Sequence, residues 1–144
     1  MTSREAKELL LLHGFSHPSA HDDPRAARGF LGSLRPYTGR LDPRNLHEVM
    51  AALVTLAPEL ERPSVDREIL DALWSMTHLA RAWALDPDGM LRRNGLISDD
   101  DAGTLASWIE AISYATMTLL GGAGLDEALE PYRQLQTDEP VSPG

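Results

Sequence analysis

The chain has 144 residues, no cysteine and a formal net charge of −9. This length suits one ordinary domain with its own core, and the lack of cysteine excludes a disulfide framework and thiolate-ligated zinc. Residues 1–85 hold 11 acidic and 10 basic side chains, whereas residues 86–144 hold 11 and 3. The acidic C-terminal part argues against a nucleic-acid partner, because it would repel phosphates.

Two helices are expected before residue 36. Residues 3–13 are rich in leucine and end before Gly14, a common helix stop. Four consecutive leucines are too few for a signal peptide or a membrane span, so we expect a cytoplasmic protein with no membrane partner. Asp23 followed by a proline predicts the start of the second helix, and we expect it to run to Arg35, before the next proline.

Three longer helices are predicted for the centre of the fold. The first covers about 43–57, between an Asp-Pro start and Pro58; the second covers about 64–85, with Ser64 as its cap. The third covers about 98–120 and ends at a glycine pair. Apolar residues recur at helical spacing along all three. We expect five of these side chains to be buried: Leu53, Leu73, Met76, Trp108 and Ile112.

The remaining segments are predicted to be a loop, a short helix and a tail. Turn residues make 86–97 a loop, and a last helix is expected at about 125–135. We therefore predict an all-α fold, a single-domain bundle of five to six helices over residues 1–137, with a disordered tail at 138–144.

Metal and cofactor signatures are weak throughout. His17, His21, Asp22 and Asp23 lie within seven residues, and imidazole with carboxylate can bind zinc, nickel or iron. However, Pro18 interrupts the helical spacing that would bring the two histidines together, and Asp23 is assigned to a helix cap. The glycine-rich segment 121–124 follows a helix and contains no lysine, unlike a phosphate-binding loop. We predict no metal site and no cofactor.

One helix face stands out as a candidate binding surface. Arg67, Asp71, Trp74 and His78 share the side of their helix opposite the apolar stripe. A neighbouring helix could cover them, a protein partner could bind there, or they could line a ligand or catalytic pocket. Tyr114 lies off the core face of the third long helix, where a second helix layer or a two-fold partner could bury it.

The sequence favours a non-catalytic acidic helical interaction protein: a regulator, adaptor or immunity-type binder that acts through protein–protein contacts, as a homodimer or with another protein. Its acidic C-terminal half would steer a basic partner. The alternative is a small-molecule-binding or catalytic helical domain with a pocket between the long helices. The sequence does not decide whether the chain is an enzyme; we rank the non-catalytic hypothesis first. The candidate binding residues are Arg67, Asp71, Trp74, His78 and Tyr114.

Overall fold

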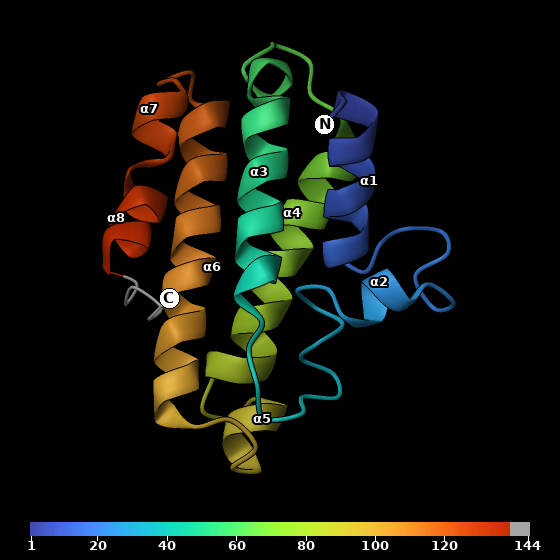
Figure 1. The fold of residues 1–144 in the computed structure, drawn as a ribbon, viewed down its shortest axis with the longest axis vertical. Coiled ribbons are helices and arrows are strands. Elements are labelled where there is room, and N and C mark those ends of the chain that lie inside the picture. The colour runs from blue at the N-terminus through green and yellow to red at the C-terminus, as the bar shows by residue number, and fades with distance from the viewer. Residues whose placement is uncertain (139–144) are drawn as a thin grey trace, which may run out of the picture.

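The computed structural model describes residues 1–138 and is all-helical, as predicted (Figure 1). No strand lies within these residues. The elements are α1 Ser3–His13, α2 Pro24–Ala27, α3 Pro43–Leu60, α4 Arg67–Ala80, the π-helix η1 Arg81–Leu85, α5 Met90–Arg93, α6 Asp99–Leu120, α7 Leu125–Ala128 and α8 Glu130–Asp138. None of them is long and apolar enough to cross a membrane.

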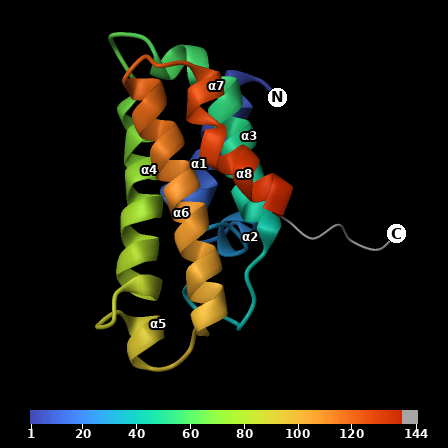
Figure 2. The ribbon, with the colours of Figure 1, turned by 90° about the vertical axis from the view of Figure 1, so that its left-hand side faces the viewer.

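The long helices form a bundle in which α1 and α6 each pack against both α3 and α4 (Figures 1 and 2). The five side chains predicted to be buried are all within the core, each with 8% exposure or less. They are Leu53, Leu73, Met76, Trp108 and Ile112. The 3.6-residue spacing of apolar side chains therefore identified the inward face of each central helix.

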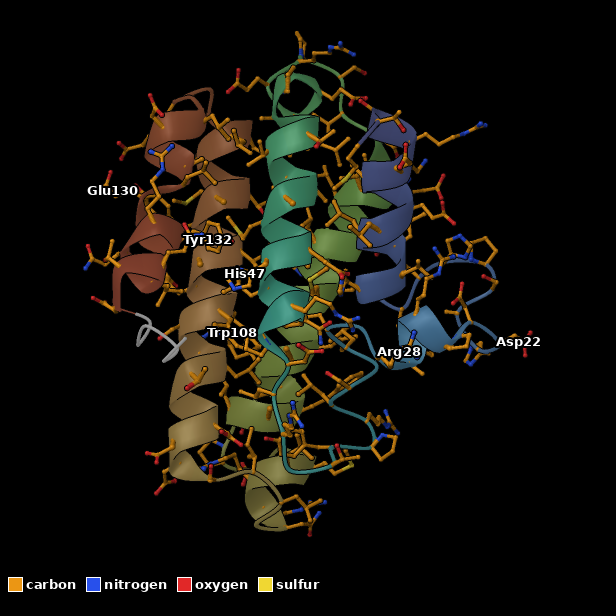
Figure 3. All side chains as sticks on the ribbon, viewed as in Figure 1. Asp22, Arg28, His47, Trp108, Glu130 and Tyr132 are labelled. Carbon is orange, nitrogen blue, oxygen red and sulfur yellow. The ribbon has the colours of Figure 1, made fainter. Side chains whose placement is uncertain are left out.

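The outer surface of α6 is covered on one side and open on the other. In Figure 2, α6 lies between α4 and the short helices α7 and α8. On the covered side, Tyr132 of α8 reaches α3, where its Oη lies 2.6 Å from Nδ1 of His47 (Figure 3). Beyond α6 on the other side, α4 is the neighbouring helix, and no third helix covers this pair within the described residues.

Helix starts follow the predicted capping chemistry with one correction. Asp23 and Asp42 each accept a backbone N–H two residues ahead, and Ser98 accepts the N–H of Asp101 at 3.1 Å. The cap of α4 is Asp66, and the prediction of Ser64 was wrong. Asp66 accepts the N–H of Glu68 and also pairs with Lys7 at 2.8 Å, which ties the start of α4 to α1.

The second helix is far shorter than predicted. It ends at Ala27 and does not reach Arg35, although the apolar side chains of Phe30 and Leu34 are buried as a helix would have buried them. The chain folds back on α2 at Gly32, where an added Cβ would lie 2.0 Å from the carbonyl oxygen of Ala26. This close approach of two backbones is possible only for glycine, and it replaces the predicted helix by turns.

Three other boundaries differ from expectation. The helix predicted to end near residue 57 continues through Pro58 to Leu60, because a proline this near the end of a helix removes only one backbone hydrogen bond, the one to the carbonyl four residues earlier. The predicted loop 86–97 contains α5, which buries Leu91. The predicted last helix is two helices, α7 and α8. The predicted tail lies outside the described residues apart from Asp138, which ends α8.

Candidate functional groove between α4 and α6

A groove of about 890 Å³ runs between α4 and α6 on the open side of the bundle. Four of the five predicted binding residues line it: Arg67, Asp71, Trp74 and His78. Tyr114, the fifth, does not. The other lining residues are Leu70, Leu73, Thr77, Arg81, Ser113, Thr116, Met117 and Leu120. The helical periodicity of the sequence thus placed four chemically unlike side chains on one side of α4, and the fold brings α6 beside them.

The wall formed by α4 is a regular stripe. Its exposed residues recur at alternating intervals of four and three, which keeps them on one side of the helix: Arg67, Asp71, Trp74, His78 and Arg81. The opposite side of α4 carries Met76 and Ala80, which are completely buried. Since α4 continues directly into η1, the stripe extends about 21 Å from end to end at 1.5 Å per residue.

The wall formed by α6 carries no charged side chain. Met117 and Leu120 expose 62% and 42% of their surface. Ser113 and Thr116 are small, so they leave the space that the groove occupies. Thr116 is also satisfied locally, because its hydroxyl donates to the carbonyl of Ile112 at 2.8 Å. Helix α6 therefore offers a shallow hydrophobic surface beside the polar stripe of α4.

Trp74 is the most exposed large hydrophobic side chain in the described residues, at 75%. The other two tryptophans have aromatic or cationic neighbours: Trp108 lies 6.4 Å from the ring of Phe30, and the guanidinium of Arg35 lies 5.5 Å from the ring centre of Trp83. Exposed tryptophan is costly to leave in water and is over-represented among the residues that dominate protein interfaces. The exposed Trp74 therefore gives the centre of the groove a large apolar surface that a binding partner can bury.

The cations of the groove have no partner inside the described part of the chain. The side chains of Arg67, His78 and Arg81 make no hydrogen bond or ion pair with residues 1–138. Asp71 accepts only a long bond of 3.4 Å from Ser75 within those residues. Three groups able to carry positive charge thus face one carboxylate, in a chain whose net charge is −9.

Tyr114 belongs to the covered side of α6. Its Oη donates to Oε1 of Glu127 in α7 at 2.8 Å, and this hydrogen bond to a carboxylate raises the pKa of Tyr114. On the same helix, Ala111 and Thr118 are buried. Of the two arrangements considered for this face, the second helix layer is the one present, because α7 and α8 both pack on α6.

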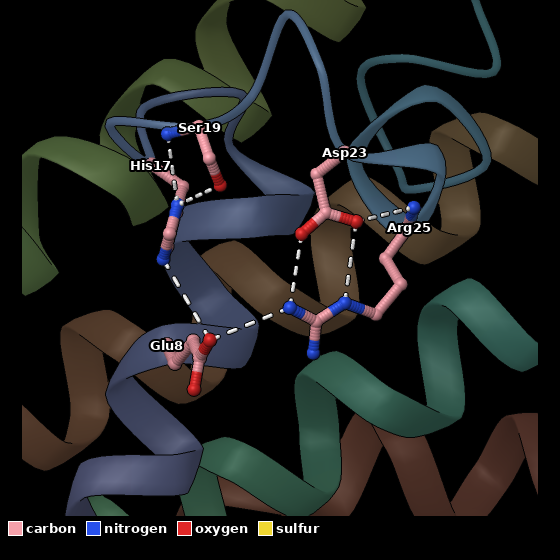
Figure 4. A network of polar contacts seen from close by, with 5 residues as sticks. All are labelled: Glu8, His17, Ser19, Asp23 and Arg25. Carbon is pink, nitrogen blue, oxygen red and sulfur yellow. Dashed lines mark hydrogen bonds and ion pairs between the residues drawn. The ribbon is translucent and has the colours of Figure 1, made fainter.

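The histidine-rich segment near α2 is a hydrogen-bonded loop (Figure 4). Nδ1 of His17 lies 2.8 Å from the Ser19 hydroxyl, and its Nε2 faces Glu8 at 3.7 Å. Asp23 is held by Arg25 at 2.9 Å, which lowers the pKa of Asp23. Among residues 1–138, no group of three or more metal-ligand side chains is placed to hold an ion.

The sequence analysis missed His13, the one buried histidine of the described chain. It is 3% exposed at the end of α1. Its Nδ1 accepts the backbone N–H of Phe30 at 3.0 Å, so the ring proton lies on Nε2, which donates to Oε1 of Glu48 at 2.9 Å. Burial is the main cause that lowers the pKa of His13, and it outweighs the opposing effect of Glu48. Through these two hydrogen bonds, His13 connects α1 to the 14–41 segment and to α3.

The groove between α4 and α6 exposes one aromatic side chain, Trp74, beside three cationic side chains that have no partner among residues 1–138. Comparisons of the chain with known protein families, with curated proteins and with solved structures found no match.

Proposed function

We propose that the chain is a non-catalytic interaction protein, a regulator, adaptor or immunity-type binder, that holds a helix of a protein partner in the groove between α4 and α6. One observation carries the proposal: Trp74 and Met117 stand exposed on opposite walls of a groove whose cations have no internal partner. Covering the two side chains would remove a large apolar area from water.

The length of the groove favours a helix over a compact ligand. Its stripe on α4 extends about 21 Å, the length of a helix of about 14 residues. An amphipathic helix laid along two others is a common mode of recognition. On the far side of α6, α8 packs on α6 and reaches α3 through Tyr132. A partner helix would complete the same layer on the open side.

The acidic residues of the C-terminal half are less available to bind a basic partner than their number suggests. Asp99 pairs with Arg92 at 2.6 Å, and Asp101 accepts from Tyr37 at 2.5 Å. Asp126 pairs with Arg133 at 3.3 Å. These carboxylates have partners within the chain, so fewer of them are available to recognise a basic protein. The contact surface is therefore better placed at the groove than at the acidic region.

A small-molecule site is the second candidate, and the volume of the groove favours it. Ligand pockets commonly measure about 300–1,000 Å³ and combine apolar walls with a few polar groups, and the 890 Å³ groove fits that description. Catalysis has less support, since His78 has no hydrogen-bond partner among residues 1–138 that would orient it as a base.

Site-specific crosslinking in the native cell tests the proposal. A photoreactive residue replaces Ser113, which lines the groove, or Val54, which is exposed on α3 and serves as the control. We expect a discrete adduct to another protein, or to a second copy if the chain is a homodimer, from position 113 only. Adding Trp74→Ala to the groove probe should remove that adduct.

Two results would contradict the proposal. An adduct pattern that is the same from both positions would mean that the groove has no special role. A stoichiometric small molecule in native mass spectra, together with no protein adduct from position 113, would favour the ligand-binding alternative.

A further inference from the structure

The groove differs in charge from the rest of the molecule. Its lining holds Arg67, His78 and Arg81 against a single carboxylate, Asp71, whereas the whole chain has 22 acidic and 13 lysine or arginine residues. A partner that docks there meets positive charge at the contact surface, although the net charge of the chain is −9. Charge complementarity of this kind selects between partners and sets their register.

The two arginines mark the ends of the groove. Arg67 lies in the first turn of α4 and Arg81 begins η1, with Trp74 midway between them. A small anion can meet only one of these two arginines, because their backbone positions are about 21 Å apart along the helix axis. A helix laid along the groove meets both if it carries a carboxylate near each end and apolar side chains between.

A second copy of the chain fits this stripe poorly. Trp74 is the centre of the stripe, so a two-fold axis through it would run two α4 helices antiparallel and bring Arg67 of one copy beside Arg81 of the other. This contact would occur twice, and like charges facing each other across helices are destabilising. Asp71, the single carboxylate of the groove lining, would lie opposite Thr77 of the other copy, so neither guanidinium pair would have a carboxylate directly opposite it.

We infer that the occupant of the groove is an acidic amphipathic helix of another protein, with apolar side chains against Trp74 and Met117 and a carboxylate opposite each of Arg67 and Arg81. This inference rests on the proposed function and adds the chemical class of the partner. His78, between the two ends, can donate a hydrogen bond to a carboxylate of the same helix or accept one from a hydroxyl.

Binding of designed peptides tests the inference. The probe is a labelled peptide of about 18 residues with leucine at i, i+4 and i+7 and one glutamate near each end, about 14 residues apart. A second peptide carries lysine in place of both glutamates. We expect the glutamate peptide to bind the full chain about tenfold more tightly than the lysine peptide by fluorescence anisotropy, as two exposed ion pairs allow.

Charge reversal provides the matched control. The double variant R67E/R81E should bind the glutamate peptide about tenfold more weakly than the native chain and should prefer the lysine peptide. The variant R28E/R40E changes the net charge equally, at exposed arginines outside the groove lining, and should bind both peptides as the native chain does. Circular dichroism of each variant confirms that the fold is retained.

The outcomes separate the inference from the proposal beneath it. Equal or tighter binding of the lysine peptide, or equal loss in both charge variants, would overturn the acidic helix while leaving a groove for some other helix. Failure of both peptides to bind, with a protein adduct still formed from position 113, would also reject an acidic helix but retain the proposed function. Failure of both peptides and of the crosslink would reject both.

Discussion

Two histidines show how differently the two regions of this molecule are built. His13 is 3% exposed, and both of its ring nitrogens have partners, Phe30 and Glu48. His78 is exposed on α4 and has no hydrogen-bond partner among residues 1–138. A buried polar group must be satisfied inside the fold, because leaving it unpaired costs stability. An exposed group without a partner costs little, so it is free to meet another molecule.

The same contrast extends beyond histidine. The region around α1, α3 and the 14–41 segment is closed by internal contacts, whereas the groove presents Trp74 and Met117 to solvent. Because of this contrast, substitutions in the closed region should change the free energy of unfolding, and substitutions in the groove should leave it almost unchanged. Matched pairs of variants measure the difference.

The largest effect is expected from the two faces of α4. Met76→Ala should reduce the free energy of unfolding by about 2–5 kcal/mol, because it leaves a cavity at a fully buried position. Trp74→Ala, two residues away on the exposed face, should change it by no more than about 0.5 kcal/mol. Urea unfolding followed by circular dichroism gives both values. Similar losses in both variants would show that Trp74 is part of the core.

A pH dependence should follow from His13. Its folded-state pKa is lowered by burial, whereas the unfolded chain has an ordinary histidine pKa of about 6.5. The contribution of His13 to the free energy of unfolding is therefore fully present above about pH 6.5 and decreases below it, because the unfolded state binds a proton that the folded state does not bind. The slope is up to about 1.4 kcal/mol per pH unit. Urea midpoints measured between pH 5 and 7.5 test this.

Substitution of each histidine shows which one causes the slope. His13→Gln should remove this contribution to the pH dependence, although the variant is less stable at every pH. His78→Gln should keep the slope of the native chain. If the slope survives in His13→Gln, another group is responsible for it.

A smaller difference is expected between two tyrosines that both donate to carboxylates. Tyr37 is half-buried, and its bond to Asp101 measures 2.5 Å; burial and this bond raise the pKa of Tyr37. Tyr37→Phe should cost about 1 kcal/mol of stability. Tyr114→Phe removes the more exposed bond to Glu127 and should cost less. Thermal unfolding of the two variants compares them, and the reverse order would contradict the contrast.

The face of α4 could be predicted because the information is local. Apolar side chains at helical spacing define the inward face of the helix, and Arg67, Trp74 and His78 then necessarily share the other. The caps formed by Asp23, Asp42 and Ser98 were predictable for the same reason, since each acts on residues two or three positions ahead.

Features that depend on how the chain folds back on itself could not be predicted in this way. The early end of α2 coincides with the close approach of Gly32 to Ala26, six residues earlier, which helical spacing alone does not indicate. The position of Tyr114 depends on which side of α6 is covered by α7. His13 carries no local signal, because its partner Phe30 is 17 residues further along the chain.

Chemical-shift mapping by NMR tests the central claim most directly, because it locates the docking surface residue by residue. The isotope-labelled chain is titrated with the glutamate peptide. We expect the largest shifts at the Trp74 indole N–H, at the Met117 methyl group and along α4 from Arg67 to Arg81, with little change at Tyr114 or Tyr132. Shifts centred on α7 and α8, or spread evenly over the surface, would contradict the assignment of the groove as the binding site.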